Sequence, residues 1–398
     1  MQEEEYEVTP ELITEISKKS VIEARKISRQ VARILGKVAQ VRKLILDGYV
    51  EDVRIIDVNN ISVDPHRVSC YAIDSSFKSP LPLVFGDLFL VVGGYVRYPR
   101  VETRNTKINR GLRVLIRCRE ELTSRIQSAI SKLVERRIAL DILKSGEYDT
   151  VKWNTLIFDG PIVPLWPLIL FTRSLYTQEQ KLLDMSRRII RTSRRKRKSI
   201  IGIIKRVRTH FIGRGIVKHL LDGGYLSGLK QREVKALKRV NDKALATLLL
   251  NPGEAMSIGK LGTSSVIIDA LLEIGRKAAF DEFVDSNPWI RDVYVVFIKP
   301  KRSRHVVRLE ILDYGGIGFR DILGWINENS SHTACPYILD VVDRYTAISN
   351  IIYELTRKIM IRSTAHTLSK LLKGLEIEEV DLLLELADLQ KKYVPRMG

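Results

Sequence analysis

The sequence contains few cysteines and no long apolar run. Cys70, Cys118 and Cys335 are odd in number and too widely spaced for a disulfide framework or a CxxC zinc site. No stretch reaches the roughly 18 uninterrupted apolar residues that a membrane span needs. The acidic start, Gln2–Glu5, is the opposite of the basic beginning of a signal peptide. These absences predict a cytoplasmic protein with reduced thiols and no membrane span.

Acidic residues are scarce relative to basic ones. Lys and Arg number 66 against 47 Asp and Glu, which gives a formal net charge of +19. Such an excess favours a polyanionic partner, with nucleic acid first and an anionic membrane surface second. A basic but inert surface is the plain alternative. At 398 residues and 45% hydrophobic content, the chain is long enough to bury a sizeable core.

Two aspartates stand in apolar stretches that predict β-strands. Asp74 interrupts the stretch Cys70–Ser76, and Asp159 ends another strand-like run before Gly160 and Pro161 break it. The residues between them, from 112 to about 145, predict a helix that carries glutamates. Strand aspartate, helix glutamate and strand-end aspartate is the order found in nucleases with a ribonuclease-H-like sheet. We therefore expect an α/β fold with a mixed sheet flanked by helices.

The helix offers three glutamates as a third acid. They are Glu120, Glu121 and Glu135, and the last two lie 14 residues apart, nearly four turns, so periodicity does not choose between them. Glu135 is nearer in sequence to the strand that ends at Asp159. Hydrolysis of a phosphodiester with two metal ions requires three or four carboxylates. Oxygen ligands of this kind select Mg²⁺ or Mn²⁺ rather than zinc.

Helices are expected at both ends of the chain. Thr9 and Pro10 suit the start of a long helix that continues to about Asp47, because its apolar residues recur every three or four positions. That helix is expected either to dock a partner or second copy, or to pack on its own sheet. The predicted elements after it are strands over 53–98, 200–206, 293–298 and 306–312, and helices over 232–250 and from 319 onward.

The most charged stretch of the chain is 187–198, at the end of another predicted helix. At 3.6 residues per turn, Arg191, Arg194 and Arg195 share one face with other basic residues, while Ile189 and Ile190 lie opposite. A basic stripe of this kind can follow a phosphate backbone, since each neutralised phosphate adds salt-sensitive affinity. A solvated helix end is the bland alternative. The stretch leads into a strand that ends in positive charge, which favours nucleic-acid contact.

Six short motifs, in this order, resemble those of the NurA nuclease family. They are Ala72–Ser76, Glu135–Leu140, Leu156–Gly160, Gly202–Arg206, Leu250–Glu254 and Pro336–Arg344. The resemblance covers about residues 69–349. It implies a ribonuclease-H-like core and Mn²⁺-dependent cleavage of DNA, with 5′-to-3′ exonuclease and single-strand endonuclease activity. Mg²⁺ is the alternative metal, and two ions are expected in each active site.

The resemblance also implies partners and a division of the chain. It predicts a homodimer that binds single-stranded DNA and duplex ends, and that works with the hexameric HerA ATPase translocase in DNA end resection, without a membrane partner. The expected parts are an N-terminal helical arm over 1–50, a nuclease domain over 51–350 and C-terminal helices over 351–398.

Carried over by position, the resemblance assigns roles to single residues. Asp74, Glu135 and Asp159 would be metal ligands, and Asp343 a fourth acid, with Asp340 one turn away as its rival. The predicted nucleic-acid contacts or charge stabilisers are Lys205, Arg206, Arg308, Arg191, Arg194, Arg195 and Tyr337, the last of which is expected more in the core than stacked on a base. Ser75 and Pro161 stand where the family commonly has glycine and serine, which leaves the ligands intact.

Other functions remain open at this stage. A non-catalytic nucleic-acid-binding subunit of an ATPase complex would keep the basic surface without needing the acids. A nuclease or recombinase directed at RNA would share the sheet, because contacts to phosphates read neither base nor sugar.

Overall fold

The computed structural model describes most of the chain. The described residues are 10–64, 67–78, 81–83, 86–99, 110–119, 123–144, 153–164, 175–207, 209–226 and 230–371. Glu120 and Glu121, and residues 372–398 of the expected C-terminal helices, lie outside this part.

The described strands form one mixed sheet in the order β1-β8-β9-β10-β7-β6-β2-β4-β3, with β5 paired to β4. Their bounds are β1 Arg54–Asp57, β2 Cys70–Phe77, β3 Leu81–Leu83, β4 Gly86–Tyr98, β5 Arg110–Arg119, β6 Thr155–Asp159, β7 Ser199–Ile204, β8 Glu254–Lys260, β9 Tyr294–Lys299 and β10 Val307–Leu312. In the middle of the sheet, β2, β6 and β7 run parallel, and the pairs outward from them are antiparallel. The α/β fold with a mixed sheet is therefore confirmed, while its ribonuclease-H-like classification stays a prediction.

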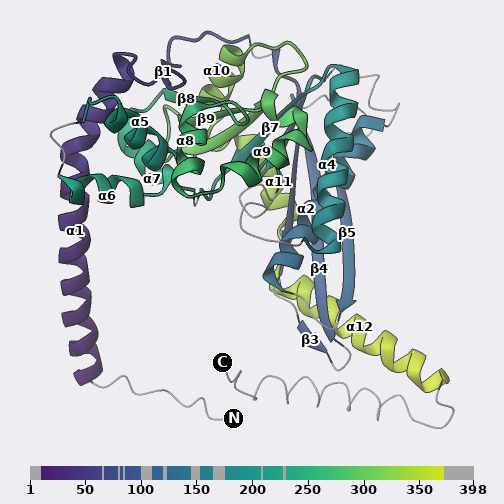
Figure 1. Cartoon of the computed structure of the whole chain (residues 1–398). Helices are drawn as coiled ribbons and strands as arrows, with labels where there is room; N and C mark the ends of the chain where they lie inside the picture. The colour runs from purple at the N-terminus through teal and green to yellow at the C-terminus, as the bar shows by residue number, and fades with distance from the viewer. Residues whose placement is uncertain are drawn as a thin grey trace.

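Helices cover both faces of this sheet (Figure 1). Their bounds are α1 Pro10–Leu46, α2 Ser124–Lys144, α4 Thr177–Lys196, α5 Val217–Asp222, α6 Gln231–Arg239, α7 Asp242–Leu249, α8 Ser265–Glu273, α9 Lys277–Asp285, α10 Phe319–Asn329, α11 Tyr337–Thr346 and α12 Asn350–Leu371. Among the described helices, none is long and apolar enough to cross a membrane.

Two apolar cores lie on opposite faces of the sheet. Tyr71 and Ile73 of β2 pack into a core with α2 and α4. Cys70 and Ala72, the residues that alternate with them, pack into a second core with α10 and α11. Because successive side chains of a strand point to opposite faces, this alternation fixes the face on which every later residue of β2 lies.

The long N-terminal helix is confirmed as α1. Its C-terminal part packs against α6, α7 and β1, where Val41 and Ile45 are buried. Its N-terminal part projects from the body, as α12 does at the other end of the described chain (Figure 1). Both projecting parts expose apolar side chains, with Ile16 54% and Ile351 81% exposed. The use of α1 as a docking arm stays a prediction.

The expectation of a helix from residue 112 is wrong, because residues 110–119 form strand β5. Leu112, Val114 and Ile116 alternate with positions that hold mostly arginine, which is the two-residue period of a strand. Ten register pairs join β5 to β4, from Asp87 opposite Arg119 onward, and the helix α2 begins only at Ser124. Pairing with the preceding strand β4 thus decided a segment whose local pattern was ambiguous.

Two glycines let other elements approach the sheet closely. A Cβ on Gly93 of β4 would lie 2.4 Å from Cγ1 of Val134, so the missing side chain admits α2. A Cβ on Gly202 of β7 would lie 2.6 Å from the carbonyl oxygen of Gly160, so the loop after β6 can fold over β7. The first contact positions α2 and the second positions the loop that follows Asp159, and both elements belong to the site described below.

We expect Gly202→Ala to lower the free energy of unfolding by about 1–3 kcal/mol, because the new methyl group meets backbone that cannot swing aside. Gly36→Ala is the matched control, since a Cβ on this residue of α1 would have no other heavy atom within 4 Å. That substitution should stabilise by about 0.5–1 kcal/mol through helix propensity. Denaturant unfolding of both variants measures the change in the free energy of unfolding, which should be negative for Gly202→Ala and positive for Gly36→Ala. Equal changes in the two variants would contradict the close approach at Gly202.

Candidate active site

Asp74 and Asp159 lie side by side on two parallel strands. In the register of β2 with β6, Ile73 is opposite Phe158, so the next position on each strand holds an aspartate. On its other side Asp74 is opposite Gly94 of β4, which has no side chain to crowd the carboxylate. The strands therefore bring together two acids that are 85 residues apart in sequence.

The two aspartates share one face of the sheet. Cys70 and Ala72 pack toward α10 and α11, as does Ile157 of β6. Continuing the alternation by two residues places Asp74 and Asp159 on that same face. The pairing expected from sequence is thus present in the geometry of the strands.

Glu135 reaches the site from the opposite face. It lies on α2, is fully buried, and accepts a hydrogen bond of 2.7 Å from Oγ of Ser75, the neighbour of Asp74. Nζ of Lys132, one turn earlier on α2, donates to the same Oε1 atom at 2.7 Å. The other oxygen, Oε2, is buried without a hydrogen-bond partner among the described residues. A buried carboxylate oxygen with no donor has capacity for a further cation.

The three acids act on one another electrostatically although they come from two faces. Burial raises the pKa of Asp74 to about 8, and the charges of Asp159 and Glu135 add to the effect, against Lys132. Burial also raises the pKa of Glu135, opposed by Lys132 and Arg136. Perturbation by burial together with like charges is characteristic of functional sites.

Two lysines supply positive charge beside these acids. Nζ of Lys205, just beyond β7, donates to Oδ2 of Asp159 at 2.8 Å. Nζ of Lys132 donates to the carbonyl oxygen of Asp159 at 2.5 Å. Burial would lower the pKa of Lys205, but Asp159 raises it more, so the ammonium stays charged. Sequence analysis found Lys205 and missed Lys132, whose signal is its position three residues before Glu135 on a helix.

The oxygen donors of this site are of the kind that binds a divalent cation, although they do not converge on a single point. Among the described residues, no group of three His, Cys, Asp or Glu side chains is arranged to hold a metal ion. Asp74, Asp159 and Glu135 nevertheless offer the oxygen donors that Mg²⁺ and Mn²⁺ prefer. The partnerless Oε2 of Glu135 is the observation that favours such an ion.

The loop after Asp159 is held by side chains of helix α2 and of strand β10. Nη2 of Arg136 on α2 donates to the carbonyl oxygen of Pro161 at 2.6 Å. Oε2 of Glu310 on β10 accepts from the backbone amides of Ile162 and Val163 at 2.7 and 3.1 Å. These contacts fix the backbone that follows the aspartate.

Arg308 lies in this buried network. It is 6% exposed, and its Nη2 donates to Oε1 of Glu310 at 2.8 Å. In this arrangement it supports the residue that holds the loop, whereas a contact with phosphate stays a prediction.

The two candidates for a fourth acid lie on α11, which packs against β2. Asp343 is exposed, and within the described part of the chain no hydrogen bond or ion pair joins its carboxylate to the other three acids. Asp340 accepts a hydrogen bond of 2.7 Å from Oγ of Ser331. The structure thus brings Asp74, Asp159 and Glu135 into one electrostatic group and leaves the fourth position undecided.

Comparison with known proteins decides the family. A family model described as NurA domain matches residues 68–348, which is most of the chain. The chain belongs to the NurA domain family. The match extends from just before β2 to just after α11 and so includes Asp74, Glu135, Asp159 and Asp343. A search of curated proteins found no match.

Solved NurA structures are similar to the chain at low sequence identity. A crystal structure of the NurA nuclease from Sulfolobus solfataricus has 13% identity and a TM-score of 0.44, covering 88% of this chain and 99% of that one. A crystal structure of NurA bound to dAMP and manganese has 11% identity and a TM-score of 0.43, covering 95% of this chain and 99% of that one.

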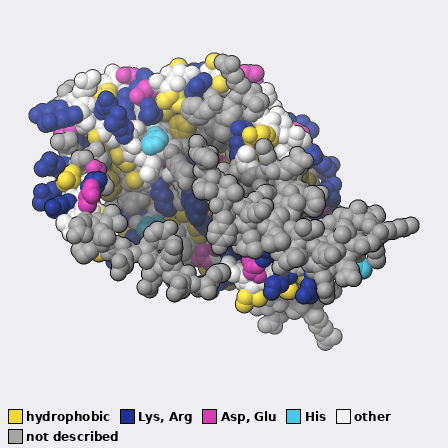
Figure 2. All heavy atoms as spheres, turned by 90° about the horizontal axis from the view of Figure 1, so that it is seen from below, with side chains coloured by type: hydrophobic (Ala, Val, Ile, Leu, Met, Phe, Trp, Pro, Cys, Tyr) yellow, Lys and Arg dark blue, Asp and Glu magenta, His cyan; other side chains and the backbone are white. Residues whose placement is uncertain are grey.

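The predicted basic stripe of the NurA domain lies on the exposed side of α4. Ile189 and Ile190 are buried, whereas Arg191, Arg194 and Arg195 are exposed, as the helical period predicts. Arg206, at the end of β7, is also exposed. Figure 2 shows a second gathering of Lys and Arg on the side where α1 and α6 lie. The described part of the chain therefore presents two basic surfaces that suit a polyanion.

Tyr337 is not in the core, so that expectation is wrong. Its side chain is 49% exposed at the start of α11, and its ring meets the ring of Tyr98 edge to face, with centroids 6.3 Å apart. Tyr337 begins α11, and the following residues Ile338 and Leu339 are the ones that face the core. Its exposed ring is free on one side, and stacking on a base stays a prediction.

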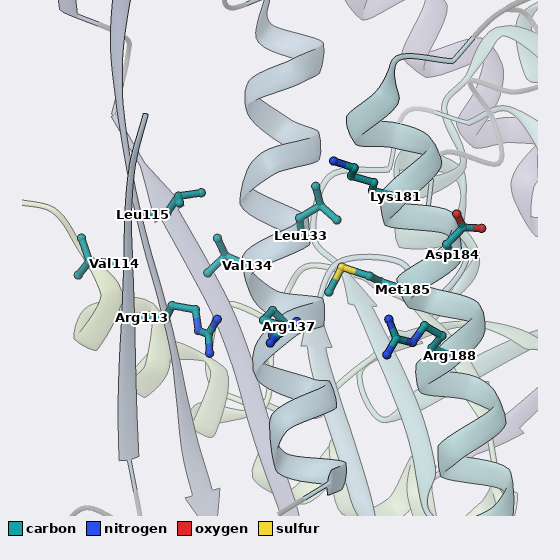
Figure 3. A pocket seen from close by; sticks show the side chains of 10 residues that line it. All are labelled: Arg113, Val114, Leu115, Leu133, Val134, Arg137, Lys181, Asp184, Met185 and Arg188. Atoms are coloured by element: carbon teal, nitrogen blue, oxygen red, sulfur yellow. The ribbon is translucent and has the colours of Figure 1, made fainter. Parts of the chain in front are cut away.

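A separate hollow of about 500 Å³ lies between α2, α4 and β5 (Figure 3). Leu115, Leu133 and Met185 form apolar walls, and Arg137 and Arg188 lie on its rim. Arg188 stands one turn before Arg191 and so connects the hollow with the basic stripe of α4. None of the predicted acids lines this hollow, so it is distinct from the candidate active site.

The buried charge of Asp74 predicts a pH dependence in metal-free protein. Because the pKa of this carboxyl is higher in the folded state than in the unfolded state, the folded state binds more protons between about pH 4 and pH 8. The contribution of Asp74 to the free energy of unfolding therefore falls as pH rises through that range. Asp74→Asn removes the charge, and we expect it to raise the unfolding temperature by about 2–4 °C at pH 8.5 and less at pH 5.

Thermal unfolding in a chelator measures this difference. Asp141→Asn is the control, because the side chain of that acid on α2 is 44% exposed. A gain from Asp74→Asn that is the same at both pH values would show that the carboxyl is not charged at a buried site.

Proposed function

We propose that this NurA-domain protein is a metal-dependent nuclease that hydrolyses phosphodiester bonds of DNA. The observation that carries the proposal is the adjacent pair Asp74 and Asp159, electrostatically coupled to Glu135. Like charges are costly to bury side by side, so their persistence at one sheet position favours a role for cations there.

Asp74, Asp159 and Glu135 would hold the metal, which the resemblance to NurA nucleases favours as Mn²⁺. When bound, such an ion activates water and stabilises charge on phosphoryl oxygens. Mg²⁺ is the alternative, and a pair of ions is part of the proposal. Asp343 is proposed to assist from α11, where it is exposed beside the sheet.

The residues around the acids set their positions. Ser75 donates to Glu135 and orients that carboxylate toward β2. Lys205 pairs with Asp159 and, at 30% side-chain exposure, also presents positive charge where a scissile phosphate would approach. Positive charge fixed before the substrate arrives stabilises the charge that develops on the phosphoryl group. Arg136 and Glu310 keep the loop after Asp159 in place.

The finer activities and partners rest on the family resemblance. We propose 5′-to-3′ exonuclease and single-strand endonuclease activity, in end resection with a HerA-type hexameric ATPase. A homodimer is part of the same proposal, and it is supported by the exposed apolar residues of α1 and α12, because monomers rarely expose many such side chains on projecting helices.

A non-catalytic nucleic-acid-binding subunit is the second candidate. The basic surfaces on α4 and near α6 favour it equally, because electrostatic binding to a phosphate backbone needs no acids. Only the nuclease candidate requires the acidic residues of the site, so substituting one of them distinguishes the two candidates.

Asp159→Asn tests the catalytic proposal. It removes a metal-binding charge and the Lys205 ion pair while keeping the side-chain shape, so we expect cleavage of labelled single-stranded DNA with Mn²⁺ to fall at least about 100-fold. Asp141→Asn, which changes a partly exposed acid on α2, should cleave like the unaltered protein.

The same assay distinguishes the two candidates. If the unaltered protein leaves the DNA intact with Mn²⁺ and with Mg²⁺, or if Asp159→Asn cleaves as fast, the nuclease proposal is wrong and the binding-subunit candidate stands.

The salt dependence of DNA binding tests the α4 stripe. Each lost phosphate contact lowers the slope of log affinity against log salt concentration by about 0.7–0.9. We expect Arg191→Ala with Arg194→Ala to reduce the slope by about one to two. Fluorescence anisotropy in a chelator measures binding without cleavage.

The matched comparison removes two exposed charges from α6, Arg232→Ala with Lys235→Ala. The stripe assignment fails if this pair reduces the slope and the α4 pair does not, because the DNA would then follow the other basic surface.

A further inference from the structure

Lys132 lies where the acids of the two layers meet. Its Nζ donates to Oε1 of Glu135 at 2.7 Å and to the carbonyl oxygen of Asp159 at 2.5 Å. Its charge also acts on Asp74, where it opposes the effects of the other two acids. One ammonium group thus contacts two of the three acidic residues and screens the third.

The contacts of this ammonium are those that a hard cation would seek. Carboxylate and carbonyl oxygens bind both an ammonium and a divalent ion such as Mn²⁺. The side chain of Glu135 is fully buried, whereas the side chain of Lys132 is 27% exposed to solvent. The lysine can therefore move toward solvent on its flexible stem, while Glu135, held by Ser75, stays in place.

Lys132 also remains charged in this setting. Burial would lower the pKa of its amine, but Glu135 and Asp159 raise it more, and the balance lies above the usual value.

We propose that Lys132 is a built-in counter-cation, which neutralises Glu135 in the metal-free protein and must leave Glu135 when a divalent cation binds. This inference rests on the proposed function, because it requires that the acids bind such a cation. It makes Lys132 a positioning residue whose departure removes one of the two donors to Oε1, so that Oε1, still held by Ser75, can join the partnerless Oε2 of Glu135 at a cation.

A purely structural tie between α2 and the end of β6 is the competing explanation. Both explanations predict that removing the amine destabilises the metal-free protein. They differ in metal affinity: loss of a competing cation tightens binding, whereas loss of a structural tie leaves binding unchanged or weakens it.

The test measures Mn²⁺ binding by titration calorimetry and thermal unfolding in a chelator, on the full chain. Lys132→Met removes the charge and keeps the length of the stem, and Lys132→Arg keeps the charge. Lys144→Met removes an exposed charge from the last turn of the same helix and serves as the control.

We expect Lys132→Met to lower the unfolding temperature without metal and to bind Mn²⁺ about tenfold more tightly, since a competing positive charge is gone. Lys132→Arg and Lys144→Met should bind Mn²⁺ within about twofold of the unaltered protein. If Lys132→Met does not remain folded, Lys132→Gln, which keeps a hydrogen-bond donor, replaces it with the same expectation.

The outcomes separate this inference from the proposed function. Mn²⁺ binding that is unchanged or weaker in Lys132→Met overturns the counter-cation role and leaves the nuclease proposal standing. Binding by Lys132→Met but not by the unaltered protein supports the counter-cation role. Absence of Mn²⁺ binding in both overturns the two proposals together.

Discussion

Two like charges at neighbouring positions of parallel strands are the constraint on which the site depends. Asp74 is only 4% exposed, and Asp159 stands next to it. Repulsion between them, together with loss of water, disfavours the charged state unless cations lie close by. Without metal, Lys132 and Lys205 offset only part of this cost, since the pKa of Asp74 is still raised to about 8, and Gly94 gives the carboxylates room.

The surrounding network keeps these charges in one geometry. Arg136 of α2 and Glu310 of β10 hold the loop after Asp159 on the face of the sheet that α2 covers, and both are almost wholly buried. Removing one partner of a buried ion pair typically costs about 3–5 kcal/mol, because the other charge is left unpaired. In the sequence, Arg136 and Glu310 are recognisable only as charged residues. Their role in holding the loop depends on their positions in the folded sheet and helix.

The surface divides into regions of different chemistry. Exposed arginines follow α4, and Arg188 links them to an apolar hollow beside α2. The projecting parts of α1 and α12 carry exposed isoleucines and leucines. Basic surfaces suit a polyanion and apolar helices suit protein partners, so the candidate active site lies in a frame that offers surfaces for both kinds of contact.

The sequence by itself determined the elements that have a strong local pattern. The strands that carry Asp74 and Asp159, the helix α1 and the basic face of α4 follow from local apolar patterns, which need no distant partner. Pairing with the preceding strand β4 decided that residues 110–119 form a strand, although their local pattern allowed a helix as well. Tertiary structure also decided that the aspartates share a face while Glu135 comes from the other, and it placed Lys132 between them. The register of the strands, and not the spacing of residues along the chain, determines which charged groups become neighbours. The electrostatic interaction between two groups depends on the resulting distance between them.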